Sequence, residues 1–392
     1  MTSTAWPLRS LRNCARFLSG GTPSKARADF WDGDIPWVSS GEMTELRIYD
    51  TPLHINEEGA IDGSRLVPAN TVLTVVRGMS LAKEFRIALT RREMAFNQDI
   101  KALACEADVA SEFLFYALLA RRGHIRELAS EASHGTKRLE TEVLSAFQVP
   151  VPRDLKVQRR VVAILSAYDD LIENNRRRIA LLEEAARRLY NEWFFRRRFP
   201  GHEHTHITNG VPEGWRPSTL GAVTKNSDRL RVPLSVFERE VRPGPYPYHG
   251  AAGVLDHIDG FIFEGKYLLV GEDGTVQTAT GTPMLQFVEG KFWVSNHAHV
   301  IQGREVSTEF LYCLLAAYPI AGHVTGVAQP KLTQANLNRI PVLIPPIVLS
   351  DQFQVAVEPM FAQRFMLKAE VEVLLAARNL LLPRLMSGDL AV

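Results

Sequence analysis

Two stretches of the chain carry residue types that catalysis would require, and neither completes the pattern. Gly260 to Lys266 has the spacing of a G-x-x-x-x-G-K nucleotide-binding loop, but Tyr267 stands where a serine or threonine would bring a hydroxyl to magnesium. Asp273 with Glu289-Gly290-Lys291 resembles the D…E-x-K set of metal-dependent nucleases, whose carboxylates hold a metal and an activated water. The central glycine instead favours a hairpin turn that would splay the two side chains apart. We therefore expect neither a phosphate loop nor a nuclease centre.

Candidate metal and redox residues are equally sparse. His202, His204 and His206 have no carboxylate or cysteine at ligand spacing, which favours a flexible linker over residues 198–206. The cysteines, Cys14, Cys105 and Cys313, stand far apart and are interpreted as small buried hydrophobic residues. The sequence also lacks the G-x-G-x-x-G, G-x-S-x-G and H-E-x-x-H signatures. It thus predicts a recognition protein with no catalytic residues, no metal site and no cofactor of its own.

Length and composition favour a folded protein of two or three domains. The chain has 392 residues, 46% hydrophobic and 23% charged, which is sufficient for sizeable cores. No run of 18 apolar residues could span a bilayer, and the first residues lack a signal-peptide core. We therefore expect a cytoplasmic protein.

The element that organises the chain is a long helix predicted over residues 153–199. Apolar side chains recur at steps of three and four, as on one face of a helix of roughly 65 Å. Asn175 interrupts the repeat as a stutter with a polar residue on the seam, a device that fixes register. The stripe consists of Val157, Val161, Ile164, Tyr168, Leu171, Asn175, Ile179, Leu182, Ala186, Leu189 and Trp193. So long a helix needs a partner helix to cover its stripe.

A second long helix is predicted between Ser350 and Met386, within the segment 347–392. Ser350 and Asp351 are its expected N-caps, Pro383 and Gly388 mark its end, and Pro359 predicts a kink or a late start. Its stripe is Phe353, Val357, Met360, Arg364, Leu367, Val371, Leu374, Arg378, Leu381 and Leu385. Two such helices predict an antiparallel coiled coil, although each could also be an ordinary core helix.

Positive charge is concentrated on the first helix. Residues 153–199 hold 12 basic and 7 acidic side chains, while the whole chain has a net charge of +1. Such an excess suits a surface facing a polyanion, and it also suits a solvated helix face with interleaved glutamates. Most of it comes from Arg176, Arg177, Arg178, Arg187, Arg188, Arg196, Arg197 and Arg198.

The chain contains an internal repeat. Trp6 to Leu11 resembles Trp215 to Leu220, Asn97-Gln98-Asp99 resembles Asn296-His297-Ala298, and Lys137-Arg138-Leu139 falls near Pro330-Lys331-Leu332. The order of the matches is preserved, and each copy ends in a proline-containing strand before a long helix. The predicted organisation is a mixed α/β domain over 1–152, a helix over 153–199, a second domain over 200–346 and a helix over 347–392.

At this point the residues carry a family resemblance. The relevant stretches are GGTPS…FWDGDIPWVSSGEM (20–43), VPVP (149–152), QRRVVAILS (158–166), DDLIENN (169–175), LLEEAARRLYNEWF (181–194), PEGW…LG (212–221) and LPRLMSGDL (382–390). As an ordered set they resemble the specificity subunit of type I restriction-modification systems. The resemblance implies an α+β fold with two target recognition domains, separated by two long helices that pack as an antiparallel coiled coil.

The same resemblance implies function and partners. Each recognition domain would read one half of a bipartite double-stranded DNA site, and the helices would set the spacing. The chain itself would be non-catalytic. It would recruit two DNA methyltransferase subunits, which use S-adenosylmethionine, and two restriction subunits, which use ATP and magnesium.

Residues that read DNA are expected among polar loop positions. Arginine, lysine, asparagine and glutamine suit base edges, whereas serine and threonine suit phosphates, and for each position a structural role is the alternative. In the first domain the candidates are Thr22, Ser24, Lys25, Ser39, Ser40, Arg77, His134, Thr136, Lys137 and Arg138. In the second domain they are Tyr248, His249, Lys266, Asn296, His297, Gln329 and Lys331.

Two other classes of function stay open from the residues alone. A free-standing nuclease or methyltransferase would act on DNA without partners, given metal or S-adenosylmethionine. A coiled-coil scaffold without DNA binding would show no salt-dependent interaction with DNA even beside its partners.

Overall fold

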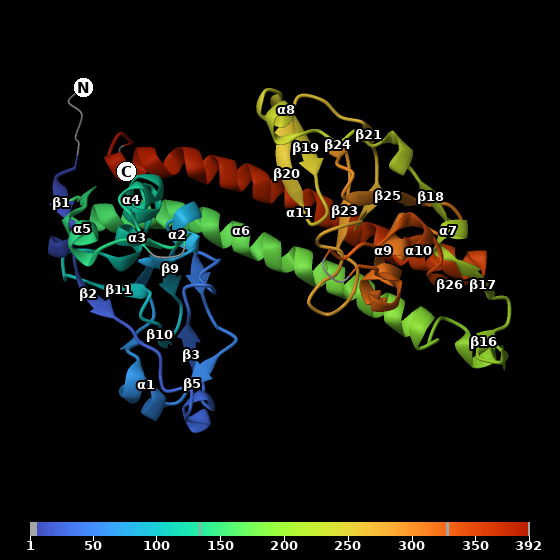
Figure 1. The fold of residues 1–392 in the computed structure, drawn as a ribbon, viewed down its shortest axis with the longest axis horizontal. Coiled ribbons are helices and arrows are strands. Elements are labelled where there is room, and N and C mark those ends of the chain that lie inside the picture. Colours follow the sequence, from blue (N-terminus) through green and yellow to red (C-terminus); the bar gives the residue numbers. More distant parts are fainter. Residues whose placement is uncertain (1–5, 133–134, 327–328, 391–392) are drawn as a thin grey trace. The chain divides into compact units, whose positions relative to one another are not determined.

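The computed structural model describes residues 6–132, 135–326 and 329–390. The chain divides into two compact units, Met1–Glu173 with Glu372–Val392, and Asn174–Val371. Each unit contains one mixed α/β domain together with part of α6 (Leu155–Tyr190) and part of α11 (Ile347–Ser387) (Figure 1). The predicted fold class, two α/β domains and two long helices, is confirmed.

The main sheet of the first domain has five strands in the order β2-β11-β7-β9-β4. Its central strands pair antiparallel, and α3 and α4 follow in sequence. Residues Val72–Val75 and Ile87–Thr90 are buried throughout, because the sheet is covered on both faces. The bounds are β2 Ala15–Ser19, β4 Arg47–Ile48, β7 Val72–Val75, β9 Ile87–Thr90, β11 Ile100–Cys105, α3 Ser111–Leu119 and α4 Arg122–Glu127.

A second sheet of the first domain has the order β5-β3-β10-β6, with β3 and β10 parallel. Strand β3 (Ile35–Val38) lies inside this sheet and not at its edge, because it pairs with β10 on one side and with β5 on the other. The bounds are β5 His54–Ile55, β6 Leu66–Val67 and β10 Met94–Phe96, and α1 covers Glu57–Gly63.

The second domain repeats the second sheet strand for strand, and it repeats the main sheet without a counterpart of the edge strand β4. Its main sheet has the order β18-β25-β22-β23 and its second sheet the order β20-β19-β24-β21, in which β19 and β24 are parallel. The bounds are β18 Thr224–Asn226, β19 Pro243–His249, β20 Val254–Ile258, β21 Phe263–Glu264, β22 Tyr267–Gly271, β23 Leu285–Val288, β24 Lys291–Val294, β25 Ala298–Gly303 and α9 Thr308–Ala317. The predicted internal repeat is thus present in the topology.

Short elements complete each domain. In the first, β1 (Leu8–Ser10) pairs with β14 (Gln148–Pro150), as β17 (Arg216–Thr219) pairs with β26 (Pro341–Ile344) in the second. The others are α2 Ser80–Lys83, β8 Arg77–Gly78, β12 Ser130–Glu131, β13 Lys137–Arg138, α5 Thr141–Ala146, β15 Ile207–Thr208, β16 Val211–Pro212, α7 Leu220–Val223, α8 Val236–Glu240 and α10 Gln334–Asn338.

Breaks in the chain separate several elements of the two domains. Helices α3 and α4 are separated by a break at Ala120–Arg121. Strands β21 and β22 are separated at Gly265, whose φ of +119° turns the chain. Glu289-Gly290-Lys291 is a turn but not a hairpin, since β23 pairs with β22 and β24 with β19 and β21.

In the first unit the start of α6 packs against the end of α11. Val161, Val162 and Leu165 share one buried cluster with Leu382, Leu385 and Met386, so the two segments run antiparallel. The stripe predicted for this part of α6 was wrong by one residue, because Leu165 and Ile172 are buried where Ile164 and Leu171 were expected.

In the second unit the end of α6 packs against the start of α11. Phe194 stacks edge-on against Phe353 at 4.9 Å between ring centroids, and Glu183 pairs with Arg364 further along. These two segments therefore also run antiparallel. The stripe predicted for α11 is confirmed, since its ten residues are buried or half-buried.

The ends of the helices differ from those predicted. α11 begins at Ile347, where the carbonyl of Pro346 accepts the amides of Leu349 and Ser350, so Ser350 and Asp351 are not its caps. It runs unbroken through Pro359 and Pro383 and ends before Gly388, whose φ is +83°. The segment after α6 is not an extended linker but a π-helical turn over Asn191–Phe195 and a short 3₁₀ turn over His202–His204.

Candidate nucleic-acid interface

One edge of the first domain gathers most of the predicted polar residues. The parallel strands β3 and β10 end side by side, which brings Ser39 beside Asn97, whose amide donates to the Val38 carbonyl at 2.9 Å. The Val76 amide bonds the carbonyl of Asp99, so the end of β7 meets the same edge. We call this set of loops, residues 38–41, 76–78, 97–99 and 135–138, the first reading edge.

Basic side chains concentrate at the first reading edge. Arg138 of β13 is the register partner of Arg77 of β8, and Lys137 is the partner of Gly78. Arg86 donates to the carbonyls of Ser40 and Gly41, so a third arginine supports the same loops. Arg77 and Arg138 are exposed, and Arg138 is held at 3.0 Å from Glu140.

Among the remaining candidates of the first domain, Thr22 contacts this edge. The Thr22 hydroxyl donates to Gln98 Oε1 at 2.7 Å, which places Thr22 beside the 97–99 loop. Ser24 and Lys25 are exposed in the following loop, and Thr136 is half-buried next to Lys137. His134 lies outside the described residues.

The second domain presents the equivalent loops. The Glu272 amide donates to the His297 carbonyl, as the Val76 amide donates to the Asp99 carbonyl in the first domain. The Leu332 amide donates to the Glu272 carbonyl, as the Leu139 amide donates to the Val76 carbonyl. Lys331 forms isolated bridges with Thr325 and with Asp273, the counterpart of Arg77, and so occupies the place of Arg138 in the first domain. We call residues 271–273, 295–298 and 329–332 the second reading edge.

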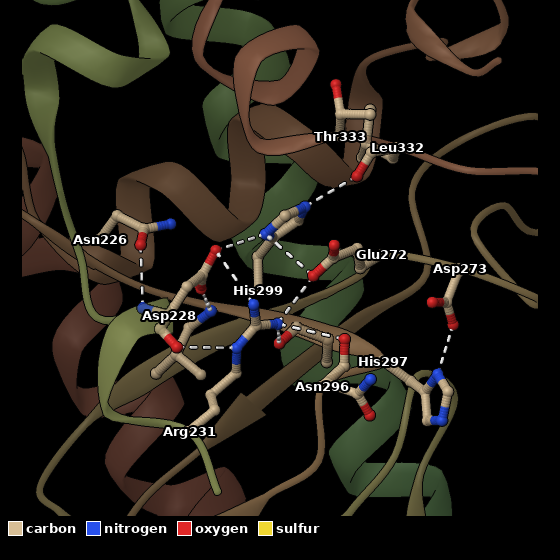
Figure 2. A network of polar contacts seen from close by, with 12 residues as sticks. Asn226, Asp228, Arg231, Glu272, Asp273, Asn296, His297, His299, Leu332 and Thr333 are labelled. Carbon is tan, nitrogen blue, oxygen red and sulfur yellow. Dashed lines mark hydrogen bonds and ion pairs between the residues drawn. The ribbon is translucent and has the colours of Figure 1, made fainter. Parts of the chain in front are cut away.

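Four predicted residues meet at the second reading edge. Asn296, His297, Gln329 and Lys331 are all exposed there. His297 Nδ1 lies 2.5 Å from Asp273 Oδ1 (Figure 2). Lys331 Nζ lies 3.7 Å from Glu272 Oε1.

Three predicted residues of the second domain have structural partners instead. Tyr248 is 1% exposed and its hydroxyl accepts the Leu234 amide, while His249 is 7% exposed, bonded to Gln286 and packed against Phe292. Burial lowers the pKa of His249, so its ring is neutral inside the fold. Lys266 is held by Glu309 and Glu358. The expectation that Tyr248 and His249 are surface loop residues is corrected.

Sequence reasoning missed several polar residues of the two edges. Gln98, Arg86, Asp273 and Arg231 were not predicted, although each lies in or directly supports a reading edge. The repeat that aligns Asn97-Gln98-Asp99 with Asn296-His297-Ala298 was the signal that could have found Gln98.

The described residues contain one group with metal-ligand chemistry. Ligand atoms of Asp228, Glu272 and His299 lie within 4.8 Å of one another. However, Arg231 Nη1 lies 2.8 Å from Glu272 Oε2, and both ring nitrogens of His299 are engaged. A guanidinium inside the group already supplies positive charge, so these side chains do not fit a cation.

Two domains of one topology, each presenting a polar and partly basic loop edge, define a tandem nucleic-acid-reading protein. The family model described as type I restriction modification DNA specificity domain matches residues 5–184 and 212–356. The match covers most of the sequence, and the chain belongs to this family. It is therefore a sequence-specificity subunit of a type I restriction-modification system, a class whose catalytic activities reside in partner subunits.

Similar proteins agree with this assignment. The chain is 26% identical over 412 residues to the type I restriction enzyme MjaIX specificity subunit of Methanocaldococcus jannaschii, covering 99% of this chain and 94% of that one. It is 30% identical over 165 residues to the EcoR124I/EcoR124II specificity subunit of Escherichia coli, covering 42% and 41%. The crystal structure of a type I S subunit from M. genitalium superposes with a TM-score of 0.62 at 16% identity, covering 98% and 97%, and so shares the fold. Among the described residues no helix is long and apolar enough to cross a membrane.

Proposed function

We propose that the first reading edge reads one half of a bipartite DNA sequence and the second reading edge reads the other half. The observation that carries this proposal is the repeated topology, which presents equivalent loops at the same place on both sheets. Different side chains at equivalent loop positions would then give two different half-sites. Arg138 and Lys331 supply a cation at the same place in both domains, whereas Asp99 and His297 differ.

Sequence-specific binding needs contacts to phosphates and contacts to base edges, and the side chains of the two reading edges suit both. Exposed Arg77 and Arg138 and half-buried Lys137 suit phosphates and guanine edges, and Asn296 and Gln329 suit adenine edges. Helices α6 and α11 would act as the spacer, because a stiff helix pair holds two readers at a fixed separation along the duplex.

Partner subunits would dock on the exposed side of α11. In the second unit Val348 and Val355 lie one heptad apart and are 66% and 75% exposed, and in the first unit Val373 and Leu380 repeat this pattern at 68% and 72%. Two such patches suit two methyltransferase subunits, one on each unit. S-adenosylmethionine would be bound by these partners, and ATP and magnesium by two restriction subunits, in a complex that works in the cytoplasm.

The test of this function is methylation by the assembled complex. The chain is produced with its methyltransferase subunits in a host that lacks other modification, and genomic methylation is mapped. We expect one bipartite motif with a fixed gap. The chain alone, given DNA, metal and S-adenosylmethionine, should neither cut nor methylate. Methylation scattered without a split motif, or activity of the isolated chain, would contradict the proposal.

The docking surface has a separate test. Val348→Asp with Val355→Asp should lower the methyltransferase content of the purified complex from two copies to one, measured by native mass spectrometry. The matched control is Glu372→Gln with Glu370→Gln, which changes charge at exposed positions of the same helix without touching the apolar patches. Two copies retained by the aspartate variant would place the docking surface elsewhere.

A further inference from the structure

A polar network lies directly behind the second reading edge. Figure 2 shows Asp228, Glu272 and the Leu332 carbonyl around His299, with Arg231 paired to the two carboxylates. His299 is only 1% exposed, and it sits on β25 two residues beyond His297. The network joins the three segments that form the edge, because Glu272 leads into Asp273, His299 follows Asn296 and His297, and Leu332 follows Lys331.

The hydrogen bonds of His299 determine its protonation. Nε2 lies 2.7 Å from the carbonyl oxygen of Leu332, and Nδ1 lies 2.6 Å from Asp228 Oδ2. A carbonyl and a carboxylate only accept hydrogen bonds, so both ring nitrogens must donate. A neutral imidazole can donate from one nitrogen only. Both bonds are therefore satisfied only by the imidazolium form.

The charges around the ring balance in that form. Glu272 faces His299 at 3.7 Å and Arg231 at 2.8 Å, while Lys331 approaches Glu272 from the surface. Two carboxylates thus meet two cations, buried His299 and half-buried Arg231. Burial acts to raise the pKa of Asp228, but the bond and charge of His299 and the amide of Val300 outweigh it and hold that pKa below its ordinary value.

Arg231 extends the same network to the third segment. Its Nη1 also donates to the carbonyls of Asn296 and Ala298, at 3.3 Å and 2.7 Å. The backbone on both sides of His297 is therefore fastened to a guanidinium that Glu272 and Asp228 hold in place. If the contact between His299 and Asp228 is lost, the anchor of this loop is weakened.

The first domain has a lysine at the position equivalent to His299. Lys101 lies two residues beyond Asp99 as His299 lies two beyond His297, and its Nζ donates to Ser19 Oγ at 2.6 Å. Ser19 is the register partner of Lys101 on β2, the strand equivalent to β18 that leads into Asp228. Where Glu272 stands in the second domain, the first has the buried apolar residue Val76. An ammonium group does not titrate near neutral pH, whereas an imidazolium does.

We propose that His299 is a positioning residue that holds the second reading edge in its reading conformation only while both of its nitrogens are protonated. This inference rests on the proposed function of the two edges. Loss of one proton removes either the bond to Leu332 or the bond to Asp228, so the loops carrying Lys331 or His297 are released. Discrimination at the half-site read by the second domain then declines as pH rises, while discrimination at the other half-site does not.

The test uses the assembled complex and a mapped bipartite site. Methylation rates are measured on matched DNA and on DNA with one base pair changed in either half-site, from about pH 6 to about pH 9. The ratio of matched to mismatched rates cancels the pH dependence of the methyl-transfer step. We expect the ratio for one half-site to fall about tenfold with rising pH, as expected for loss of one charge-assisted hydrogen bond, and the other ratio to stay constant.

Variants assign the effect to His299. His299→Gln keeps one donor and should show the low ratio at every pH for the same half-site, without a pH profile. The matched change in the first domain, Lys101→Gln, should lower the ratio for the other half-site only, again without a pH profile. If His299→Gln does not fold, the wild-type profile with its internal half-site control still decides.

The outcomes separate this inference from the proposed function. Failure of the wild-type complex to methylate any bipartite site would overturn the proposed function itself. Bipartite methylation with both ratios independent of pH, or with His299→Gln retaining the wild-type profile, would overturn only the role of His299.

Discussion

Asp169 of α6 and Arg378 of α11 form a buried ion pair, with 2.7 Å between Oδ1 and Nη1 and side chains 8% and 9% exposed. The hydroxyl of Tyr116, on α3 of the first domain, donates to the other carboxylate oxygen at 2.7 Å. The second unit holds a matching pair, Glu183 with Arg364, in which the acid is again on α6 and the arginine on α11. On a mainly apolar seam between two helices, a pair of opposite charges specifies which residues of the two helices face each other.

Breaking the first pair should destabilise the protein strongly. Arg378→Ala leaves the Asp169 carboxylate buried and unpaired, and we expect it to lower the free energy of unfolding by about 3 to 5 kcal/mol. Arg188→Ala, which removes the exposed pair with Glu184, should cost about 1 kcal/mol or less. Urea denaturation of both variants measures the difference, and equal losses would show that burial of the pair contributes nothing.

Replacing the whole pair tests what it is for. The triple variant Asp169→Leu, Arg378→Leu, Tyr116→Phe removes all three partners together and should be near wild type in stability, because no buried polar group is orphaned. If the pair specifies register, the triple variant should still lose the single spacing in a genomic methylation map. A stable triple variant with one unchanged spacing would assign register to the apolar seam alone.

Lengthening the helices should lengthen the gap in the recognised sequence. Four residues inserted near Ala180 of α6, with four near Leu367 of α11, add about 6 Å to each helix, or about two base pairs of DNA. The matched insertion keeps the antiparallel partners in step, whereas insertion in α6 alone displaces Glu183 from Arg364. We expect the matched variant to methylate a motif with a longer gap. Mapping that returned the original gap would end the spacer hypothesis.

The order of domains and helices along the chain was predictable from the sequence because each domain and its following helix occur twice with recognisable sequence matches. The ordered matches around Trp6 and Trp215 correspond to the equivalent strands β1 and β17, and Arg138 and Lys331 form equivalent backbone pairings in the two domains. The α11 stripe was predicted with both of its arginines because its spacing has no stutter.

The details that failed depend on tertiary partners. The α6 seam passes through Asp169, which reads as a surface residue until Arg378 and Tyr116 surround it, so the predicted stripe followed apolar Ile164 and Leu171 instead. Tyr248 and His249 carry hydrogen-bonding groups at the end of a strand, but the groups that satisfy them, Leu234 and Gln286, are distant in sequence. Polar type alone therefore did not separate reading residues from buried ones.

The cysteines should be inert in the folded protein. Burial raises the pKa of Cys105 to about 11, and it raises the pKa of Cys14 and Cys313 as well. A thiol with such a pKa is ionised to about one part in a thousand at pH 8, so iodoacetamide should modify the native chain far more slowly than the urea-unfolded chain. Rapid labelling of any cysteine under native conditions, read by mass spectrometry, would contradict this burial.

The same shift predicts how stability changes with pH. An unfolded thiol loses its proton above about pH 8.5, whereas folded Cys105 keeps its proton to about 11. The unfolded state is therefore favoured as pH rises between these values, and the free energy of unfolding should fall. Cys105→Ala should show a shallower fall over this window, and an unchanged slope would mean that Cys105 does not contribute.

Removing the cations of β13 should affect one half-site only. Lys137 and Arg138 lie beside exposed Arg77 on the first reading edge, and the second domain has its own cation, Lys331. We expect Lys137→Ala with Arg138→Ala to relax base discrimination at one half-site by about tenfold or more and to reduce the salt dependence of binding by about one to two ion equivalents. Arg153→Ala with Lys156→Ala removes the same charge from exposed positions around the start of α6 and is the matched control. Both double variants lose two positive charges, so a general electrostatic effect would weaken DNA binding equally in both and leave both half-sites equally discriminated. A reading role instead lowers base discrimination only in the β13 variant, and only at one half-site.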